Sequence, residues 1–275
     1  MKNSRITFIG CGNMGRSLIG GLIANGLPEN SITGTDINAE QRQTTASQYN
    51  IEMLEDNQQA IKDVDVVVLA VKPQSMEDTL KPIKETLSQK KPLLISVAAG
   101  IKLSDLGRWA GEDLAIVRVM PNTPALIQAG ATALYANKNT SSAQCDLAET
   151  IMRSVGLALW LDDETLMDTV TALSGSGPAY YFLIMEVMEK AALQLGLPQE
   201  QARILTLQTA FGAAKMALES SHDAESLRKQ VTSPGGTTEQ ALKVLIDGGI
   251  EDLFCDALKA AQKRSAELAD EFGNS

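Results

Sequence analysis

The segment FIGCGNMG, near the start of the chain, limits the fold more than any other stretch of this sequence. Gly10, Gly12 and Gly15 stand in G-x-G-x-x-G spacing, directly after a strand pattern and at the start of a helical pattern. The first glycine permits a tight turn, the second lets the backbone approach a pyrophosphate, and the third lets helix and strand pack closely. The amides of Asn13 and Met14 then lie at the positive end of the helix. The segment therefore predicts a strand-turn-helix that binds a dinucleotide.

Residues 1–162 alternate short β-branched runs with amphipathic segments, which is typical of a parallel sheet covered by helices. We expect strands within residues 5–10, 31–36, 65–71, 92–100, 114–120 and 131–137. Strand signals end after LALWLDD, and residues 163–275 have helical patterns only. The sequence thus predicts an α/β fold, in which a Rossmann-type dinucleotide-binding domain over residues 1–162 is followed by an all-helical domain over residues 163–275.

Charge and cysteine content exclude several classes of function. The formal net charge is -10, and Lys and Arg are not clustered, so we expect no nucleic-acid partner. Cys11, Cys145 and Cys255 follow no ligand spacing, so we expect neither a disulfide framework nor a metal site. Because no signal core and no membrane-spanning segment is visible, we expect a cytoplasmic protein that acts on small molecules. The single histidine, His222, lies in a polar connection and is expected to be a solvated loop residue.

Asp36 is expected at the end of the second strand, where an acidic side chain accepts a hydrogen bond from the adenosine ribose of NAD. It could equally begin the turn DINAEQ or cap the next helix. Arg42 is close enough in sequence to meet a 2′-phosphate if the loop bends, so the choice between NADH and NADPH stays open. The segments LAVKPQ and SVAAGI end two further strands, where ligands lie in open α/β sheets, although Lys72 also fits a solvated loop lysine.

The segment VTSPGGTTEQALKVL resembles the entrance of a second anion site. SPGG suits a tight turn, with Pro234 at the second position and Gly235 at positive φ. Thr237 followed three residues later by Gln240 is a capping-box pattern, which predicts Thr237 as the N-cap and Thr238 as the first helical residue. Such a helix start attracts a carboxylate. On composition alone, the same segment also fits a well-capped helix with no ligand.

The helical segment GPAYYFLIMEVMEKAALQLG is apolar around most of its circumference and spans roughly 30 Å. We expect it to be buried. A small helical domain has too little chain to cover such a helix, so the sequence predicts an obligate homodimer built on this domain.

Three further segments, MPNTPALIQAG, LSGSGPAY and VTSPGGTTEQAL, together with FIGCGNMG and AVKP, resemble the pyrroline-5-carboxylate reductase family, in order and over essentially the whole chain. The resemblance implies a Rossmann domain followed by a helical dimerisation and substrate domain. It also implies reduction of pyrroline-5-carboxylate to L-proline by NADPH or NADH, the last step of proline biosynthesis. Family members are dimers or pentamers of dimers, that is decamers, and the sequence does not decide between them.

The resemblance also implies two sets of site residues. The cofactor-binding set is Gly10, Cys11, Gly12, Asn13, Met14, Gly15, Asp36, Asn57, Ala70, Val71, Lys72, Pro73, Ala98, Ala99, Gly100 and Gln230. The substrate-binding set is Glu164, Ser233, Gly236, Thr237 and Thr238, with the loop coming from the neighbouring subunit. Two positions depart from the family pattern, since some members have Asn at Gln230 and many have Ala at Gly15.

An iminium accepts hydride readily, so the demand on the protein is mainly to position the imine over the nicotinamide. We hypothesise that Thr238 is catalytic by orienting the imine nitrogen and relaying its proton. Glu164 could favour the cationic iminium, or simply begin a helix after the acidic run DDE. Two rival readings remain. A β-hydroxyacid dehydrogenase or imine reductase would need a lysine soon after GSGPAYY, and none precedes Lys190. A non-catalytic NAD(P) sensor would be expected to have a damaged glycine turn.

Overall fold

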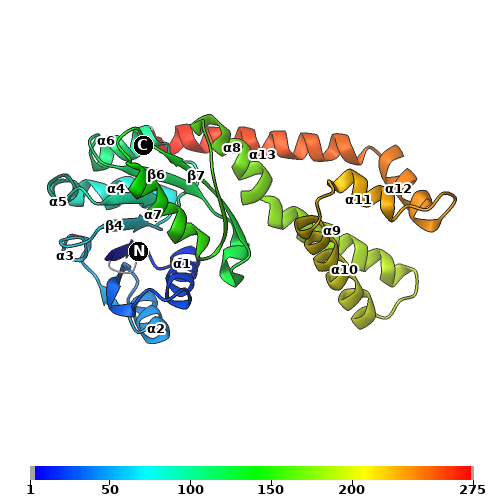
Figure 1. The fold of residues 1–275 in the computed structure, drawn as a ribbon, viewed down its shortest axis with the longest axis horizontal. Coiled ribbons are helices and arrows are strands. Elements are labelled where there is room, and N and C mark those ends of the chain that lie inside the picture. Colours follow the sequence, from blue (N-terminus) through cyan, green and yellow to red (C-terminus); the bar gives the residue numbers. More distant parts are fainter. Residues whose placement is uncertain (1–3, 274–275) are drawn as a thin grey trace. The chain divides into compact units, whose positions relative to one another are not determined.

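The computed structural model describes residues 4–273, which pack as two compact units (Figure 1). The first unit extends to Ser176 and takes up the chain again from Ala261, and the second is Gly177–Ala260. The boundary that we placed between residues 162 and 163 marks the end of the strand pattern. By packing, the division falls later, and the last part of the C-terminal helix belongs with the sheet.

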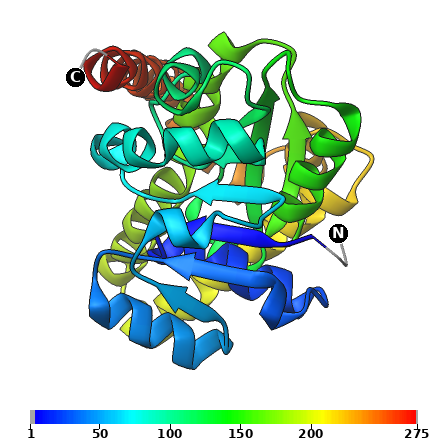
Figure 2. The ribbon, with the colours of Figure 1, turned by 90° about the vertical axis from the view of Figure 1, so that its left-hand side faces the viewer.

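The first unit contains one sheet of eight strands in the order β3-β2-β1-β4-β5-β6-β7-β8, seen side by side in Figure 2. Every neighbouring pair is parallel except β6 with β7, which is antiparallel. The strands are β1 (Ile6–Ile9), β2 (Ile32–Thr35), β3 (Glu52–Leu54), β4 (Val66–Leu69), β5 (Leu93–Ser96), β6 (Ile116–Met120), β7 (Gly130–Ala136) and β8 (Gly156–Trp160). The sequence pattern missed β3 because it is a three-residue edge strand that begins with an exposed glutamate.

The α-helices of the described chain are α1 (Asn13–Ala24), α2 (Ala39–Tyr49), α3 (Asn57–Ala60), α4 (Met76–Leu80), α5 (Lys84–Lys90), α6 (Leu103–Ala110), α7 (Ser142–Arg153), α8 (Met167–Val170), α9 (Gly177–Gln194), α10 (Gln199–Glu219), α11 (Ala224–Gln230), α12 (Thr237–Asp247) and α13 (Ile250–Gly273). A π-helical turn at Thr171–Gly175 follows α8. None of the helices within residues 4–273 combines the length and the apolar character needed to cross a membrane.

The core of the first unit lies on both faces of the sheet. Every side chain of β4, the run VVVL, is buried, as expected for a parallel strand covered on both sides. Val68 packs into a cluster with Leu18 of α1 and Ile151 of α7. Val67 faces the other way, into a cluster with α4 and α6. The sheet is therefore the central layer, and its carboxyl edge is held rigidly between the two helical layers.

The second unit leaves much of its apolar surface uncovered. On α9 the side chains of Tyr181 and Phe182 are 66% and 64% exposed, and on α10 Phe211 is 62% exposed. The expected burial of α9 is therefore not reached within one chain. An apolar groove of about 440 Å³ runs along the same helix and is lined by Tyr180, Leu183, Ile184, Val187, Met188, Leu245, Ile250, Leu253, Phe254 and Ala257.

Candidate functional site

The glycine turn after β1 lies at the carboxyl edge of the sheet, against the end of β4. Gly10 has φ +92°, and a Cβ there would lie 2.8 Å from the carbonyl of Ala70. A Cβ on Gly15 would lie 2.5 Å from the carbonyl oxygen of Gly10. Gly12 differs, because no described atom lies within 4 Å of the position of its missing Cβ. Two glycines are thus required by packing, whereas the third leaves open space beside the backbone, which fits the approach of a pyrophosphate.

The start of α1 offers unpaired amides beside this space. Gly12 is the N-cap, and no side chain of the described residues caps the helix. The first amides of an α-helix have no intrahelical acceptor, so those of Asn13, Met14 and Gly15 are free for an anion. Arg16 in the first turn adds a positive charge, and its Nη2 donates to Oδ1 of Asn13 at 3.1 Å. The arrangement fits the phosphates of a dinucleotide.

Asp36 follows β2 directly and joins its loop to the glycine turn. Its Oδ2 accepts from the Cys11 amide at 2.9 Å, and its Oδ1 accepts from the Asn38 amide at 2.9 Å. Asp36 therefore begins a turn but does not cap α2, because Asn38 is the N-cap and accepts from the amides of Glu40 and Gln41. Burial, followed by the nearby Asp36 charge, raises the pKa of the Cys11 thiol to about 12.

The ends of β2, β4 and β5 surround the same edge. Asn57 at the start of α3 accepts from the Thr35 hydroxyl at 2.6 Å, which places it beside the β2 end. The Ala70 amide donates to the carbonyl of Ile9 at 2.8 Å, so Ala70–Pro73 continue next to the glycine turn. Lys72 is exposed and precedes a short 3-10 turn.

Of the three small residues after β5, only Ala99 is half-buried. Ala98 is 4% exposed and belongs to the core. Gly100 has φ +73°, and a Cβ there would lie 3.4 Å from the ring of Phe272 on α13. The small size of Gly100 thus makes room for α13. Ala99 is the member of this loop that can meet a ring.

Glu164 lies close to this loop and joins three elements. Its Oε1 accepts from Nη1 of Arg118 on β6 and from the Leu103 amide at the start of α6, both at 2.8 Å. The Arg118 side chain is 6% exposed and that of Glu164 is 26% exposed. Within the described chain, Oε2 of Glu164 has no hydrogen-bond donor. The carboxylate therefore neutralises a buried cation through one oxygen and has a second oxygen without a donor in the described chain.

Asn122 of the MPNTP segment was not among the site residues predicted from the sequence. Its Nδ2 donates to the Ser174 carbonyl at 3.0 Å, and its Oδ1 accepts from the Ala131 amide at 2.9 Å. Ser174 needs an outside donor because Pro178, four residues later, has no N–H. A Cβ on Gly175 would lie 2.5 Å from Cε of Met120. The MPN and SGSG segments therefore interlock, and the available signal was the proline after SGSG.

The second glycine turn lies in the second unit, and its cap differs from our prediction. Gly236 donates to the Ser233 carbonyl at 3.0 Å and Gly235 has φ +70°, as expected for the turn. The N-cap of α12 is Gly236, so the prediction of Thr237 as the cap was wrong. Thr237 is the first helical residue and Thr238 the second. Gly236 has the extended backbone of an N-cap, and Oε2 of Glu239 reaches back to the Gly235 amide at 2.8 Å.

The structure thus places the expected site residues in two groups. Those of the cofactor set other than Gln230, together with Glu164, lie in the first unit at the carboxyl edge of the sheet. Gln230 ends α11 and, like Ser233 and Thr238, belongs to the second unit. His222 is exposed, as expected.

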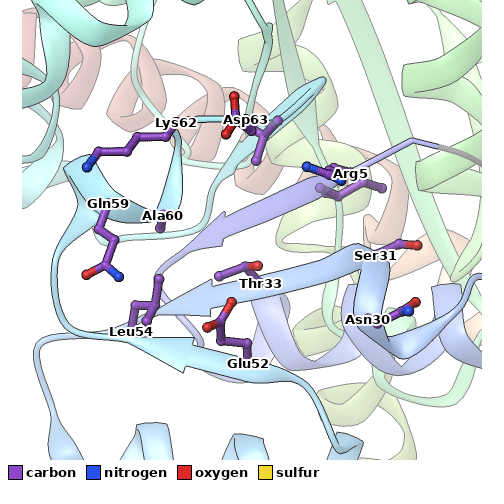
Figure 3. Close-up of a pocket in the computed structure, with 12 residues that line it drawn as sticks. Arg5, Asn30, Ser31, Thr33, Glu52, Leu54, Gln59, Ala60, Lys62 and Asp63 are labelled. Carbon is purple, nitrogen blue, oxygen red and sulfur yellow. The ribbon is translucent and has the colours of Figure 1, made fainter.

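A polar cavity of about 340 Å³ lies elsewhere, along β1–β3 (Figure 3). It is lined by Arg5, Ile6, Asn30, Ser31, Thr33, Glu52, Leu54, Gln59, Ala60, Lys62, Asp63 and Val64. None of these is a predicted site residue. Because ligands of open α/β sheets bind outside the carboxyl ends of the strands, the glycine-turn edge is the better candidate site.

Comparisons with known proteins agree with this arrangement. Residues 164–268 match a family described as pyrroline-5-carboxylate reductase dimerisation, and residues 5–100 match one described as NADP oxidoreductase, coenzyme F420-dependent. The chain is 51% identical to pyrroline-5-carboxylate reductase of Pseudomonas aeruginosa, over 99% of this chain and 100% of that one. It is 41% identical to the Haemophilus influenzae protein of the same name, over 98% of each chain.

Solved structures give the same result. A pyrroline-5-carboxylate reductase from Coxiella burnetii superposes with a TM-score of 0.93 at 48% identity, covering 97% of this chain and 98% of that one. The Plasmodium falciparum pyrroline carboxylate reductase, solved with NADP bound, superposes with a TM-score of 0.87 at 31% identity, covering 98% and 99%.

Proposed function

We propose that this chain, which belongs to the pyrroline-5-carboxylate reductase family, reduces pyrroline-5-carboxylate to L-proline with NAD(P)H. The observation that carries the proposal is the full-length match to this family in a fold that keeps both glycine turns. In the reaction, hydride adds to the carbon of the C=N bond, the ring nitrogen takes a proton, and the nicotinamide is oxidised.

The first unit supplies the cofactor site. Gly10–Gly15 and the free amides of α1 would hold the pyrophosphate, while Asp36 and Asn57 would face the adenosine. Ala70–Pro73 and Ala98–Gly100 would follow the nicotinamide half, with Ala99 as the half-buried residue under the ring. When bound, the reduced nicotinamide supplies the hydride, so the protein has to position the imine and stabilise its charge.

The second unit supplies the substrate site in this proposal. The turn Ser233–Gly236 and the amides of Thr237 and Thr238 form the start of α12, where a carboxylate is stabilised by about 0.3–1 kcal/mol from the helix dipole alone. Thr238, the second helical residue and half-buried, would orient the imine nitrogen and relay its proton. The free oxygen of Glu164 would stabilise the iminium cation. Gln230 would contact the cofactor from α11.

We further propose that the active form is a homodimer or a pentamer of dimers, in which the substrate loop comes from the neighbouring subunit. The matched dimerisation family and the apolar surface of α9 and α10 support this assembly. Cys11, Cys145 and Cys255 are all free, which fits work in the reducing cytoplasm.

The test follows the redox state of the nucleotide with two kinds of substrate, pyrroline-5-carboxylate with NADH or NADPH and β-hydroxyacids with NAD⁺ or NADP⁺. Purified enzyme with pyrroline-5-carboxylate should oxidise NADH or NADPH and form an equal amount of proline. Reduction of NAD⁺ or NADP⁺ by β-hydroxyacids, without turnover of pyrroline-5-carboxylate, would instead identify a hydroxyacid dehydrogenase. Nucleotide binding without turnover of any substrate would identify a sensor, and either result would overturn the proposal.

A further inference from the structure

We infer that this enzyme selects NADH over NADPH, and that Asp36, Ile37 and the ion pair between Arg42 and Glu55 set this choice. The inference rests on the proposed function, because it concerns the cofactor of that reaction. The two nucleotides differ only by a phosphate on the adenosine ribose. The selection therefore depends on the charge and shape of the protein where β2 meets α2.

The Asp36 carboxylate is held in one position. The amides of Cys11, in the glycine turn, and of Asn38, two residues along the same loop, donate to its two oxygens, each at 2.9 Å. A free aspartate could turn away from an incoming phosphate, but this one would have to break a hydrogen bond to do so. The end of β2 is where an acidic side chain accepts from the ribose 2′-hydroxyl. At the same place, a 2′-phosphate would meet a fixed negative charge, and like charges in contact strongly disfavour a partner.

Ile37 stands next to this carboxylate with its side chain 97% exposed. A fully exposed isoleucine on a loop has no packing role within the described chain. It suits the flat apolar face of an adenine, and it has no donor for a phosphate. The residue after Asp36 therefore favours the nucleotide without the extra charge.

Arg42 is a cation that contacts this loop, and its guanidinium already has hydrogen-bond and ion-pair partners. Its Nη1 donates to the carbonyls of Asp36 and Ile37 at 2.7 and 3.2 Å, and its Nη2 pairs with Glu55 at 3.1 Å. Its side chain is only 19% exposed. Arg16 on α1 is the other nearby cation and donates to Asn13 in the pyrophosphate turn. Both terminal nitrogens of Arg42 are therefore engaged within this loop and with Glu55, whereas Arg16 is directed to the pyrophosphate turn through Asn13.

The test measures nucleotide binding apart from turnover. Calorimetric titration of the purified enzyme with NAD⁺ and with NADP⁺ should give a Kd for NAD⁺ lower by about tenfold or more, which corresponds to about 1.4 kcal/mol. The kcat/KM values for NADH and NADPH should differ in the same direction. Equal or tighter binding of NADP⁺ would overturn the inference. A failure to reduce pyrroline-5-carboxylate would overturn the proposed function instead and leave the binding comparison intact.

Variants identify the residues responsible. Asp36→Asn keeps the shape and removes the charge, so it should tighten NADP⁺ binding and narrow the preference by about tenfold. Glu55→Gln frees the Arg42 charge and should favour NADP⁺ by about two- to fivefold, because the pair is partly exposed. Glu40→Gln removes an equal charge from an exposed residue of α2 without contact to Arg42, and it should leave the ratio unchanged. If Asp36→Asn fails to fold, the NAD⁺ and NADP⁺ affinities of Glu55→Gln test whether this ion pair sets the cofactor preference. If Glu55→Gln changes the affinities for NAD⁺ and NADP⁺ by the same factor, the assignment of the preference to these residues would be overturned.

Discussion

At the scale of single residues, one buried thiol and one hydroxyl have testable roles. Cys11 is fully buried inside the glycine turn, and burial raises its pKa to about 12. Its thiol therefore stays protonated in the folded enzyme at pH values where an unfolded chain would form the thiolate. Asp36, whose charge adds to this effect, is the same group that holds the Cys11 amide.

The consequence is a loss of stability at alkaline pH. Between pH 9.0, the ordinary pKa of a cysteine thiol, and about pH 12, the unfolded chain releases the Cys11 proton and the folded chain keeps it, so the free energy of unfolding falls as pH rises. The contribution is up to about 1.4 kcal/mol per pH unit. Cys11→Ala should show a shallower decline in urea unfolding across this range. Cys255→Ala, which removes an exposed thiol, should keep the wild-type slope; parallel slopes for all three proteins would contradict the prediction.

Thr238 is the residue assigned to the chemistry of the imine. Thr238→Ala should lower kcat by about ten- to a hundredfold, since positioned proton transfer contributes at least that much. Cofactor affinity should change little, because Thr238 is not among the residues proposed to contact the cofactor. Thr238→Ser keeps the hydroxyl and should recover most of the rate. A kcat equal to wild type in Thr238→Ala would remove the role, and stopped-flow measurement of nicotinamide oxidation supplies the value.

At the scale of secondary-structure elements, a single carboxylate joins β6, α6 and the segment after β8. Glu164 neutralises the buried Arg118 and accepts from the first amide of α6. Its removal leaves a buried cation without a partner, which is one of the costlier changes in a protein interior. The same residue therefore has a structural role whether or not it also contacts substrate.

Glu164→Ala should lower the free energy of unfolding by about 3 kcal/mol. Glu164→Gln retains an oxygen that can accept from Arg118 and from the Leu103 amide, so it should lower the free energy of unfolding by less than Glu164→Ala does. The matched control is Glu77→Ala on α4, which removes the partner of the exposed Lys81 and should cost at most about 1 kcal/mol. All proteins have to be compared at one concentration, since subunit association contributes to stability. Equal losses for Glu164→Ala and Glu77→Ala would show that the buried pair is not stabilising.

At the scale of the whole molecule, the proposal needs two chains to complete one site. The cofactor residues and the substrate turn belong to different units of one chain, and the second unit exposes the apolar surface of α9 and α10. An obligate dimer would bury that surface. A chain forced to remain monomeric should therefore lose activity as well as stability.

Subunit complementation tests which chain supplies the substrate turn. Gly12→Asp disables the cofactor site, because its side chain would fill the open space beside the turn with a negative charge. Thr238→Ala disables the substrate site. Gly12→Asp alone should be nearly inactive, and Thr238→Ala alone should keep about 1–10% of the wild-type kcat. In a mixed dimer that exchanges loops, one site unites the intact cofactor residues of one chain with the intact loop of the other, so co-expression should restore activity. Failure to restore it, with mixed dimers shown by two affinity tags, would place both halves of the site in one chain.

Local patterns in the sequence were sufficient for most of the fold. Backbone preferences over a few residues predict the turns at Gly10 and at Ser233–Gly236. Side-chain periodicity predicts the order of strands and helices. The short strand β3 was not predicted, because three residues are too few to show the alternation of a strand. The predicted N-cap of α12 was one residue too late. Glu239, and not Gln240, is the side chain that reaches back to the turn, where it accepts from the Gly235 amide.

The class of fold, the two glycine turns and the family could all be predicted from the sequence. The tertiary structure alone decided which partners the site residues have. Three examples depend on contacts between segments far apart in the chain. They are the ion pair of Glu164 with Arg118, the approach of α13 to Gly100, and the hydrogen bond from the Cys11 amide to Asp36. Such contacts arise from packing around a common core, and no pattern within a few residues specifies them.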